Sequence, residues 1–205
     1  MTTTFVPPDG FLLVSILCNQ SMIFPDNHCD RPPQASDLAP VYPWQQRLWP
    51  WLGAPLVASA WISSSSLKVF ILKLFGARLG RGVRVNPGVQ VRCPWYLTVG
   101  DYSSLGTNLR IENLAAVTIA DQVCLAQGVG LYTGRHYPQP ISIQAHSWLA
   151  PRAALGPGVI VGEGAILDAD GVATQSLQAW MIYRGNPAQI VKSRVAPYSS
   201  AVRPG

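Results

Sequence analysis

Histidine and cysteine are the residues of this 205-residue chain best suited to proton transfer, nucleophilic attack or metal binding. The chain holds three histidines, His28, His136 and His146. An imidazole titrates near pH ~6.5, so a histidine placed beside a hydroxyl group can accept its proton near neutral pH. His136 ends the segment Thr133-Gly134-Arg135-His136. Because a histidine in a turn is usually a solvated side chain, a role for His136 depends on what surrounds this segment.

The cysteines show no CxxC pair and no regular spacing; they are Cys18, Cys29, Cys93 and Cys124. Reduced thiols are the default in a chain of this size, which indicates a cytoplasmic protein. We expect Cys124 to be a packed structural thiol rather than a nucleophile. His28 and Cys29 are adjacent and could ligate a metal, but a disordered leader explains the pair more simply. We therefore expect no metal.

A six-residue repeat predicts the elements that position these residues. Aliphatic residues recur in three phases, which change near Leu97 and Val117. The repeat positions are Leu79, Val85, Val91, Val99, Leu105, Ile111, Val117, Ile119, Leu125, Leu131, Tyr137, Ile143, Leu149, Leu155, Val161 and Leu167. Tyr137, next to His136, is the single one of them that is not Ile, Leu or Val. A period of six matches neither the 3.6 of an amphipathic helix nor the 2 of a sandwich strand.

Small residues accompany the repeat. A glycine or alanine often follows the aliphatic residue; examples are Gly80, Gly100, Gly106, Ala120, Ala126, Ala150, Gly156 and Gly162. Each hexad then makes one short strand and one tight turn, and three hexads close a triangular coil of about 18 residues. The aliphatic side chain fills the corner of this prism and stacks on its counterparts in adjacent coils. The sequence predicts an all-β fold, a parallel β-helix of about five coils over residues 79–172.

Three segments flank the predicted β-helix. Residues 1–43 are a Pro-rich leader that we expect to be poorly ordered, and residues 44–78 are an amphipathic helical lead-in. Apolar residues near the end of the lead-in fall at helical spacing; they are Leu67, Phe70, Ile71 and Leu74. Residues 173–205 form a C-terminal cap and tail. The cap is predicted to include a short helix from Pro187 to Val195, because proline is tolerated at the first helical position.

Charge and hydropathy limit the classes of partner that suit this chain. The net charge of +5 suits a polyanionic ligand and equally a generic basic surface. No basic stripe with interleaved aromatic residues points to nucleic acid. Residues 54–75 are apolar, but a serine run and two lysines interrupt them, so they do not suit a membrane span. Tryptophans 44, 49, 51 and 61 prompt the hypothesis of peripheral contact with the inner membrane face through residues 44–75.

Motifs outside the repeat carry a family resemblance. They are Leu74-Phe75-Gly76-Ala77-Arg78-Leu79-Gly80, Val99-Gly100-Asp101-Tyr102-Ser103, Glu112-Asn113-Leu114-Ala115-Ala116-Val117-Thr118-Ile119, Leu131-Tyr132-Thr133-Gly134-Arg135-His136 and Tyr183-Arg184-Gly185-Asn186-Pro187-Ala188. With them, residues 44–194 resemble the hexapeptide-repeat O-acetyltransferases, and most of all those of colanic acid biosynthesis that acetylate exopolysaccharide sugars. The hexads alone identify the fold, whereas the T-G-x-H and G-N-P-A segments narrow the resemblance to this group.

The resemblance implies a left-handed β-helix that assembles as a homotrimer, with active sites in the clefts between neighbouring prisms. Acetyl-CoA would lie along the cleft, and the hydroxyl of a sugar or saccharide acceptor would sit near one histidine. Motif matching places this histidine at His136, as a general base for direct transfer. No acyl-enzyme and no metal are implied.

The resemblance also implies roles for individual residues. Asn113 lies on the loop that faces the acceptor, although a turn-forming asparagine is an equal alternative. Trp148 matches the tryptophan that opens the coil after the catalytic loop; packing is its favoured role, and substrate binding is the alternative. Three small residues match positions that line the pantetheine of CoA, and tight coil geometry alone would also explain them; they are Ala150, Ala169 and Thr174. Lys192 matches a basic residue that meets CoA phosphate, although a basic surface residue near the end of the expected helix is an alternative explanation.

The loop after His136 departs from the family pattern. The family usually has an aspartate after the histidine and then a long loop, whereas here Tyr137-Pro138-Gln139-Pro140-Ile141 follows. A second class of function is therefore a non-catalytic trimeric scaffold with an altered acceptor loop. A third, the zinc carbonic anhydrase built on the same fold, needs three histidine ligands per site. Since His28 lies outside the predicted β-helix and His146 is expected on an exposed turn, the sequence disfavours this third class.

Overall fold

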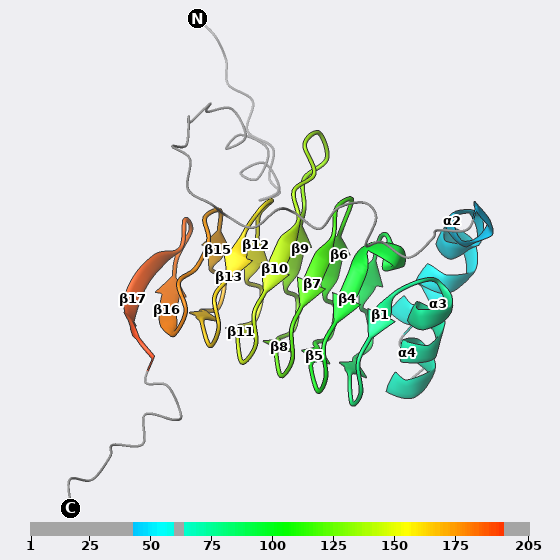
Figure 1. The fold of residues 1–205 in the computed structure, drawn as a ribbon, viewed down its shortest axis with the longest axis horizontal. Coiled ribbons are helices and arrows are strands. Elements are labelled where there is room, and N and C mark those ends of the chain that lie inside the picture. Colours follow the sequence, from blue (N-terminus) through cyan, green and yellow to red (C-terminus); the bar gives the residue numbers. More distant parts are fainter. Residues whose placement is uncertain (1–42, 60–63, 195–205) are drawn as a thin grey trace, which may run out of the picture. The chain divides into compact units, whose positions relative to one another are not determined.

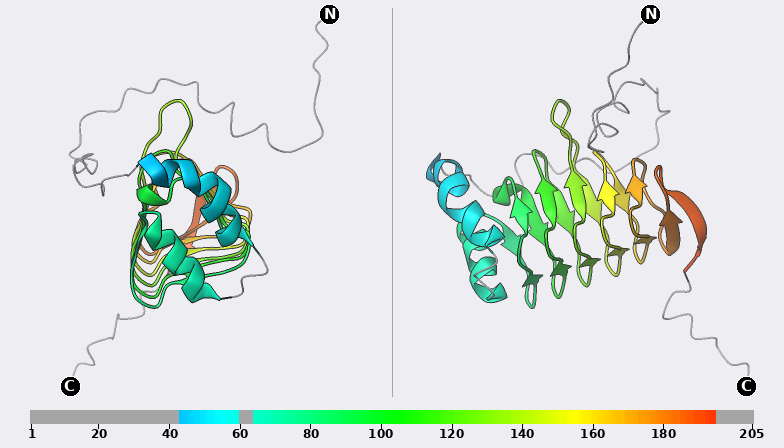
Figure 2. Two further views of the ribbon diagram at one scale, coloured as in Figure 1. Left: turned by 90° about the vertical axis from the view of Figure 1, so that its right-hand side faces the viewer. Right: turned by 180° about the vertical axis from the view of Figure 1, so that it is seen from behind.

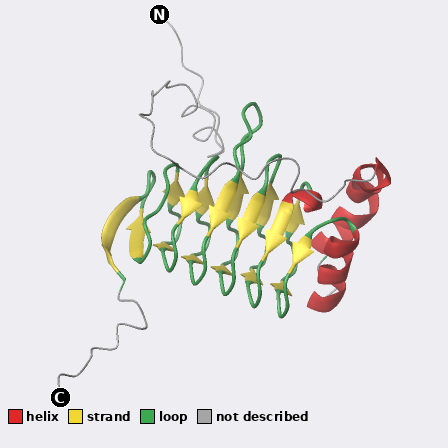
Figure 3. Ribbon diagram, viewed as in Figure 1, coloured by secondary structure: helices red, strands yellow, loops and turns green. Residues whose placement is uncertain are grey.

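The computed structural model describes residues 43–59 and 64–194, which form a left-handed parallel β-helix with helices at its N-terminal end (Figures 1 and 3). Three parallel sheets make the faces of a triangular prism, and each coil adds one strand to every sheet in turn. Five complete coils run from Arg78 to Ala173, which confirms the predicted fold class and the number of coils. The predicted leader lies outside the described residues apart from Pro43, as does Trp61.

The strands are short, and most contain two or three residues. Sheet A consists of β1 (Arg78–Leu79), β4 (Leu97–Val99), β7 (Val117–Ile119), β10 (Ile141–Ile143) and β13 (Ile160–Val161). Sheet B consists of β2 (Arg84–Val85), β5 (Ser104–Leu105), β8 (Cys124–Leu125), β11 (Trp148–Leu149), β14 (Ile166–Leu167), β16 (Met181–Arg184) and β17 (Gln189–Ser193). Sheet C consists of β3 (Gln90–Val91), β6 (Arg110–Glu112), β9 (Gly130–Tyr132), β12 (Ala154–Leu155) and β15 (Val172–Ala173).

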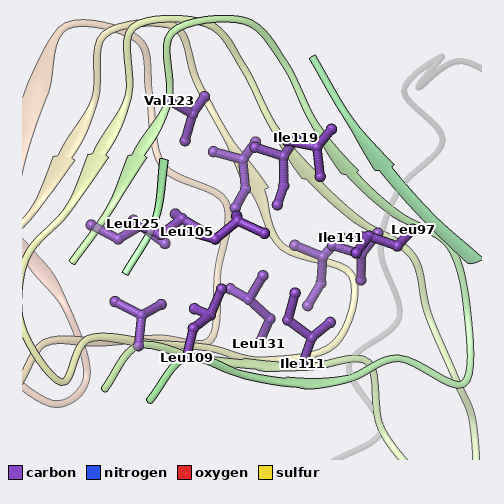
Figure 4. Packing of buried hydrophobic residues seen from close by; sticks show 14 of the residues in the cluster. Leu97, Leu105, Leu109, Ile111, Ile119, Val123, Leu125, Leu131 and Ile141 are labelled. Atoms are coloured by element: carbon purple, nitrogen blue, oxygen red, sulfur yellow. The ribbon is translucent and has the colours of Figure 1, made fainter. Parts of the chain in front are cut away.

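The aliphatic repeat residues fill the interior of the prism. In sheet B, for example, Leu105 pairs with Leu125 and Leu125 with Leu149, and all three side chains are buried. Figure 4 shows the side chains of successive coils stacked on one another inside the prism. Full burial of such a side chain contributes about 1.5–3 kcal/mol, so this stacked interior is the main source of stability.

The breaks in the repeat all lie on one edge of the prism. Arg78 pairs with Thr98 and Thr98 with Thr118, so each of these coils is slightly longer than the ideal three hexads. Thr118 pairs with Ser142, so the coil between them is longer than three hexads by one whole hexad. Ser142 pairs with Ile160, so the next coil has the ideal length of three hexads. The extra residues fall between β3 and β4, between β6 and β7, and between β9 and β10, which is the edge between sheets C and A, here called the C–A edge.

The predicted position of Tyr137 in the prism is wrong. Tyr137 is 82% exposed and belongs to the third insertion, residues 133–140, rather than to a corner of the prism. This insertion lengthens its coil by one whole hexad, so it leaves the phase of the repeat unchanged and cannot be detected by counting. The two shorter insertions shift the phase, and they lie where the sequence predicted breaks.

Helices cover the N-terminal end of the prism (Figure 2). They are α2 (Pro43–Leu48), the π-helical turn η2 (Trp49–Gly53), α3 (Ala54–Ala58) and α4 (Ser65–Leu74), and a short 3-10 helix, η3 (Pro94–Tyr96), lies on the C–A edge. This confirms a helical lead-in. Of the apolar residues predicted at helical spacing, Ile71 is buried, whereas Leu67, Phe70 and Leu74 are exposed.

The predicted helix from Pro187 to Val195 is wrong. Residues 181–193 form an antiparallel hairpin instead, in which Met181 pairs with Ser193 and Arg184 with Gln189, so that β17 ends sheet B. The β-branched Ile190 and Val191 favour a strand, and β16 offers them a free edge to pair with. After the strand, Arg194 donates hydrogen bonds to the backbone oxygens of His146 and Gly164 and lies over the ring of Trp180.

Candidate active site

The insertion of residues 133–140 projects from the C–A edge as a loop and carries the exposed His136 (Figure 1). The Gln139 N–H donates a hydrogen bond of 2.8 Å to the Thr133 carbonyl oxygen and closes the loop at its base. Gly134 has φ +91°, a conformation that disfavours any residue with a side chain. The loop therefore turns away from the prism directly after Thr133, and the imidazole of His136 is accessible to a ligand.

Thr133 fixes the base of this loop to the preceding coil. Its side chain is completely buried, and its hydroxyl donates to the Glu112 carbonyl oxygen at 3.1 Å. The same hydroxyl oxygen accepts hydrogen bonds from the backbone N–H groups of Leu114 at 2.9 Å and Ala115 at 3.3 Å. The sequence analysis did not assign this role, although Thr133 belongs to the T-G-x-H segment.

Asn113 occupies the same place one coil earlier. It is completely buried, its Oδ1 accepts from the Cys93 N–H at 3.0 Å, and its Nδ2 donates to the Cys93 carbonyl oxygen at 2.7 Å. This geometry favours the turn-forming alternative for Asn113 over direct contact with an acceptor. Cys93, Asn113 and Thr133 follow one another at equal intervals along the chain, a regularity that could have been read from the sequence.

A shallow hollow of about 190 Å³ adjoins the base of the loop on sheet C, lined by Gln90, Val91, Arg92, Arg110, Ile111 and Glu112. Glu112 binds both arginines in it, through Oε2 to Arg92 Nη1 at 2.9 Å and through Oε1 to Arg110 Nη2 at 2.7 Å. Partial burial raises the pKa of Glu112, but the hydrogen bonds from Arg110 and Arg92 outweigh burial and leave the pKa below its ordinary value. The hollow thus presents one carboxylate and two guanidinium groups, none of which was predicted as a site residue.

The small residues predicted at a CoA site border sheet C. Thr174 is exposed on the C–A edge after β15, whereas Ala150 and Ala169 lie on the edge between sheets B and C, Ala150 buried and Ala169 exposed. Between the two edges, the outward positions of sheet C in its last three coils carry Gly130, Ala154 and Val172 in register. The ring of Tyr132 covers Gly130, so the part of this face with short side chains begins at Ala154 and continues to Val172.

Trp148 and Lys192 lie elsewhere, on sheet B, the face opposite the C–A edge. Trp148 is exposed in β11 between Cys124 and Ile166, and Lys192 is exposed in β17 beside Ile182. A single chain does not bring either residue to His136. Cys124 is exposed on the same face, so its prediction as a packed thiol is wrong. Cys93 is half buried, and burial raises the pKa of its thiol.

Two further features concern metals and membranes. In residues 43–59 and 64–194, no three His, Cys, Asp or Glu side chains are grouped so that they could hold a metal ion. No helix in this same part of the chain is both long enough and apolar enough to cross a bilayer. His146 lies on an exposed turn, as predicted, with φ 59°.

Sequence comparison decides the family. No protein-family model matches the chain. The putative colanic acid biosynthesis acetyltransferase WcaF of Escherichia coli K12 is 35% identical over 137 residues, which cover 62% of this chain and 75% of WcaF. The chain belongs to the hexapeptide-repeat acetyltransferases. A second relative, the putative acetyltransferase YJL218W of Saccharomyces cerevisiae, is 27% identical over 106 residues, 46% of this chain and 54% of its own.

Solved structures of hexapeptide-repeat acetyltransferases share the fold. VCA0836 of Vibrio cholerae in complex with acetyl-CoA matches with a TM-score of 0.65 at 20% identity, over 73% of this chain and 87% of its own. A galactoside acetyltransferase in complex with coenzyme A matches with a TM-score of 0.65 at 21% identity, over 73% of this chain and 80% of its own. At these identities the likeness establishes the β-helix.

Proposed function

We propose that the protein is an acetyl-CoA-dependent O-acetyltransferase that acts on a sugar hydroxyl in exopolysaccharide biosynthesis, with His136 as the general base. The observation that carries the proposal is an exposed histidine on a short loop whose base is held by the buried hydroxyl of Thr133. The likeness to WcaF supports the exopolysaccharide role. Reduced thiols, the basis for expecting a cytoplasmic protein, agree with the two free cysteines of the described residues.

The chemistry assigned to His136 is proton transfer. A sugar hydroxyl is a poor nucleophile near neutral pH, and the imidazole takes its proton as the oxygen attacks the acyl group. The same imidazolium then returns a proton to the departing sulfur. Bound acetyl-CoA supplies an activated acetyl thioester for this exchange. Because one group accepts and then donates the proton, the step needs neither an acyl-enzyme nor a metal.

The described residues fit an extended CoA chain on sheet C. Ala154 and Val172 keep its outward face low with short side chains, and Ala169 and Thr174 border that face on its two edges. We propose that this face holds pantetheine, with Ala150 supporting the turn beside Ala169. Lys192, exposed in β17 at the C-terminal end, would meet a CoA phosphate.

We propose a homotrimer with its active sites between prisms. Trp148 and Lys192 lie on sheet B, opposite the edge that carries His136, so one chain cannot bring all predicted site residues together. A neighbouring prism, placed with its sheet B against the C–A edge, would supply Trp148 to the acceptor and Lys192 to CoA. Sedimentation equilibrium measures the assembly directly, and a monomer at micromolar concentration would contradict this arrangement.

The hollow beside the loop is the proposed place for the acceptor. Saccharide hydroxyls donate and accept hydrogen bonds, and Glu112, Arg92 and Arg110 offer a matching set of acceptor and donors. The hollow lies toward the N-terminal coils from the loop, whereas the low face of sheet C lies toward the C-terminal coils. His136 would then stand between the acceptor and the acyl donor.

An acetyl-transfer screen over nucleotide sugars and lipid-linked saccharides tests the proposal, with thiol release and product mass as readouts. For an acceptor that is turned over, His136→Ala should lower kcat by about 10²- to 10⁴-fold, the contribution typical of a general base. His146→Ala is the matched control and should leave kcat unchanged. Equal rates for the wild type and His136→Ala would sink the assignment. CoA binding without transfer to any acceptor would support the non-catalytic scaffold instead.

A further inference from the structure

The helices at the N-terminal end of the prism expose an unusual amount of apolar surface. Of the fourteen large hydrophobic side chains exposed in the described part of the chain, eight lie on α2, η2, α3 and α4. We call these eight the cap surface; they are Trp44, Leu48, Trp51, Leu52, Leu56, Leu67, Phe70 and Leu74. Scattered single residues of this kind need no explanation, but a group of eight on neighbouring helices does.

Helix α4 is apolar on two sides. Its inner side buries Ile71 and Leu72 against the first coil. A second, exposed side, here called the outer side, carries Leu67, Phe70 and Leu74, which recur at intervals of three and four residues and so form one stripe. Phe70 is 63% exposed. A helix that served only to close the end of the prism would carry polar residues there.

The segment from α2 to α3 repeats this arrangement. Its inner side is a narrow stripe at intervals of four residues, made of Gln45, Trp49, Gly53 and Val57, all buried. The indole of Trp49 donates a hydrogen bond of 3.0 Å to the Val91 carbonyl oxygen and fixes this side to the first coil. The outer side carries Trp51, 81% exposed, together with Leu48, Leu52 and Leu56. The helices that carry both stripes lie together at the N-terminal end of the prism (Figure 2).

Positively charged residues are also concentrated toward the N-terminal end of the prism. Residues 38–100 contain seven Lys and Arg and no Asp or Glu, whereas the whole chain has a net charge of +5. Of these seven, Lys68 is buried in α4, and Arg81 and Arg92 form ion pairs with Asp101 and Glu112. Arg47 in the last turn of α2 and Lys73 in the last turn of α4 are exposed beside the apolar stripes. A surface of this composition is complementary to anionic lipid headgroups above an apolar layer.

We infer that the cap surface binds an anionic phospholipid bilayer, with the apolar stripes at the headgroup boundary and the prism axis directed away from the membrane. Tryptophan is suited to this boundary because its ring is apolar and its N–H is polar. The basic residues at the rim of the surface bind anionic headgroups. The inference deepens the peripheral membrane contact that the tryptophans predict from the sequence, and it does not depend on acetyl transfer.

Co-sedimentation of the full-length chain with vesicles tests this inference without any substrate. Vesicles of phosphatidylcholine alone are compared with vesicles containing about a third phosphatidylglycerol. The double variant Trp51→Glu/Phe70→Glu removes the apolar contact, and Arg47→Gln/Lys73→Gln removes the basic rim. Ile190→Glu is the matched control, since Ile190 is 50% exposed on β17 at the other end of the prism. Thermal unfolding verifies that every variant is folded.

The wild type should bind the anionic vesicles at least tenfold more tightly than the neutral ones, and less tightly in high salt. The apolar double variant should lose at least tenfold in binding, the basic double variant should lose the preference for anionic lipid, and Ile190→Glu should bind as the wild type does. If the full-length chain stays in the supernatant, another segment such as residues 1–42 covers the surface and the inference is overturned. It is overturned equally if the apolar variant binds like the wild type, or if that variant halves the size of the assembly in solution, because a second copy would then be the occupant.

Discussion

The side-chain amide of Asn113 hydrogen-bonds both backbone polar groups of Cys93, which lies one coil earlier on the same edge of the prism. Thr133 stands one coil later in the same column, and its hydroxyl binds three backbone groups of residues 112–115. The edge with the insertions is thus tied from coil to coil by buried polar side chains. The loop with His136 is the last member of this series.

Replacement of Asn113 should destabilise the protein. Asn113→Ala leaves the N–H and carbonyl groups of Cys93 without their partner on a buried edge, and the loss should be about 1–3 kcal/mol of the free energy of unfolding. Urea unfolding followed by circular dichroism measures it. Thr118→Ala, at an exposed strand position, should change stability by less than about 0.5 kcal/mol. Equal stabilities for the two variants would show that the edge does not depend on the amide.

Thr133 should act on catalysis through the position of the loop. Thr133→Val keeps the shape of the side chain but loses the hydroxyl, so the base of the loop loses three hydrogen bonds. We expect kcat to fall about tenfold or more with little change in the KM for acetyl-CoA. Thr133→Ser restores the hydroxyl and should recover most of kcat. A variant that lost stability and CoA affinity together, with no rescue by serine, would indicate a purely structural residue.

Arg110 and Glu112 should determine acceptor affinity. Arg110→Gln and Glu112→Gln each break the ion pair in the hollow, and each should raise the KM for the acceptor about tenfold while the KM for acetyl-CoA stays within about twofold. Steady-state kinetics with both substrates varied separates the two effects. Arg81→Gln, which breaks the exposed pair with Asp101 on another edge, is the control. If all three variants behave alike, the hollow does not hold the acceptor.

Stability should fall in acid through identified carboxylates. The pKa of Asp101 is lowered by a backbone hydrogen bond and a side-chain hydrogen bond from Arg81, and the pKa of Glu112 lies below its ordinary value. A lowered folded-state pKa adds stability above the unfolded pKa, and this stability is lost as the pH falls through the folded pKa. The melting temperature should therefore be constant near neutral pH and drop below about pH 4. Glu112→Gln should weaken that drop, and an unchanged acid profile would count against its ion pairs.

The stacked interior could be predicted from sequence because a six-residue period leaves no other regular fold for the aliphatic residues. The same period could not reveal that residues 133–140 leave the prism, since an insertion of one hexad preserves the phase. The six-residue period also did not show that Trp148 and His136 lie on opposite sides of the prism. The side on which Trp148 lies depends on how many hexads separate it from His136 once the loop residues are left out of the count.

At the C-terminal end, local propensity was misleading. Pro187 suited the start of a helix, but Ile190 and Val191 pair with the open edge of β16, and tertiary pairing outweighs the local preference. The roles of Thr133 and Asn113 were obscured for another reason. A buried polar side chain that serves the backbone has the same sequence signature as one that faces a ligand, and only its hydrogen-bond partners distinguish them.

The antiparallel β17 has a consequence for self-association. A parallel β-helix is a ladder that any further chain with the same repeat could extend, so each uncovered end is a potential site for polymer growth. At the N-terminal end, helices occupy that position, and at the C-terminal end β17 runs against the direction of the ladder in sheet B. An incoming parallel strand would meet the wrong hydrogen-bond pattern there. The hairpin therefore closes sheet B against extension by a further parallel strand.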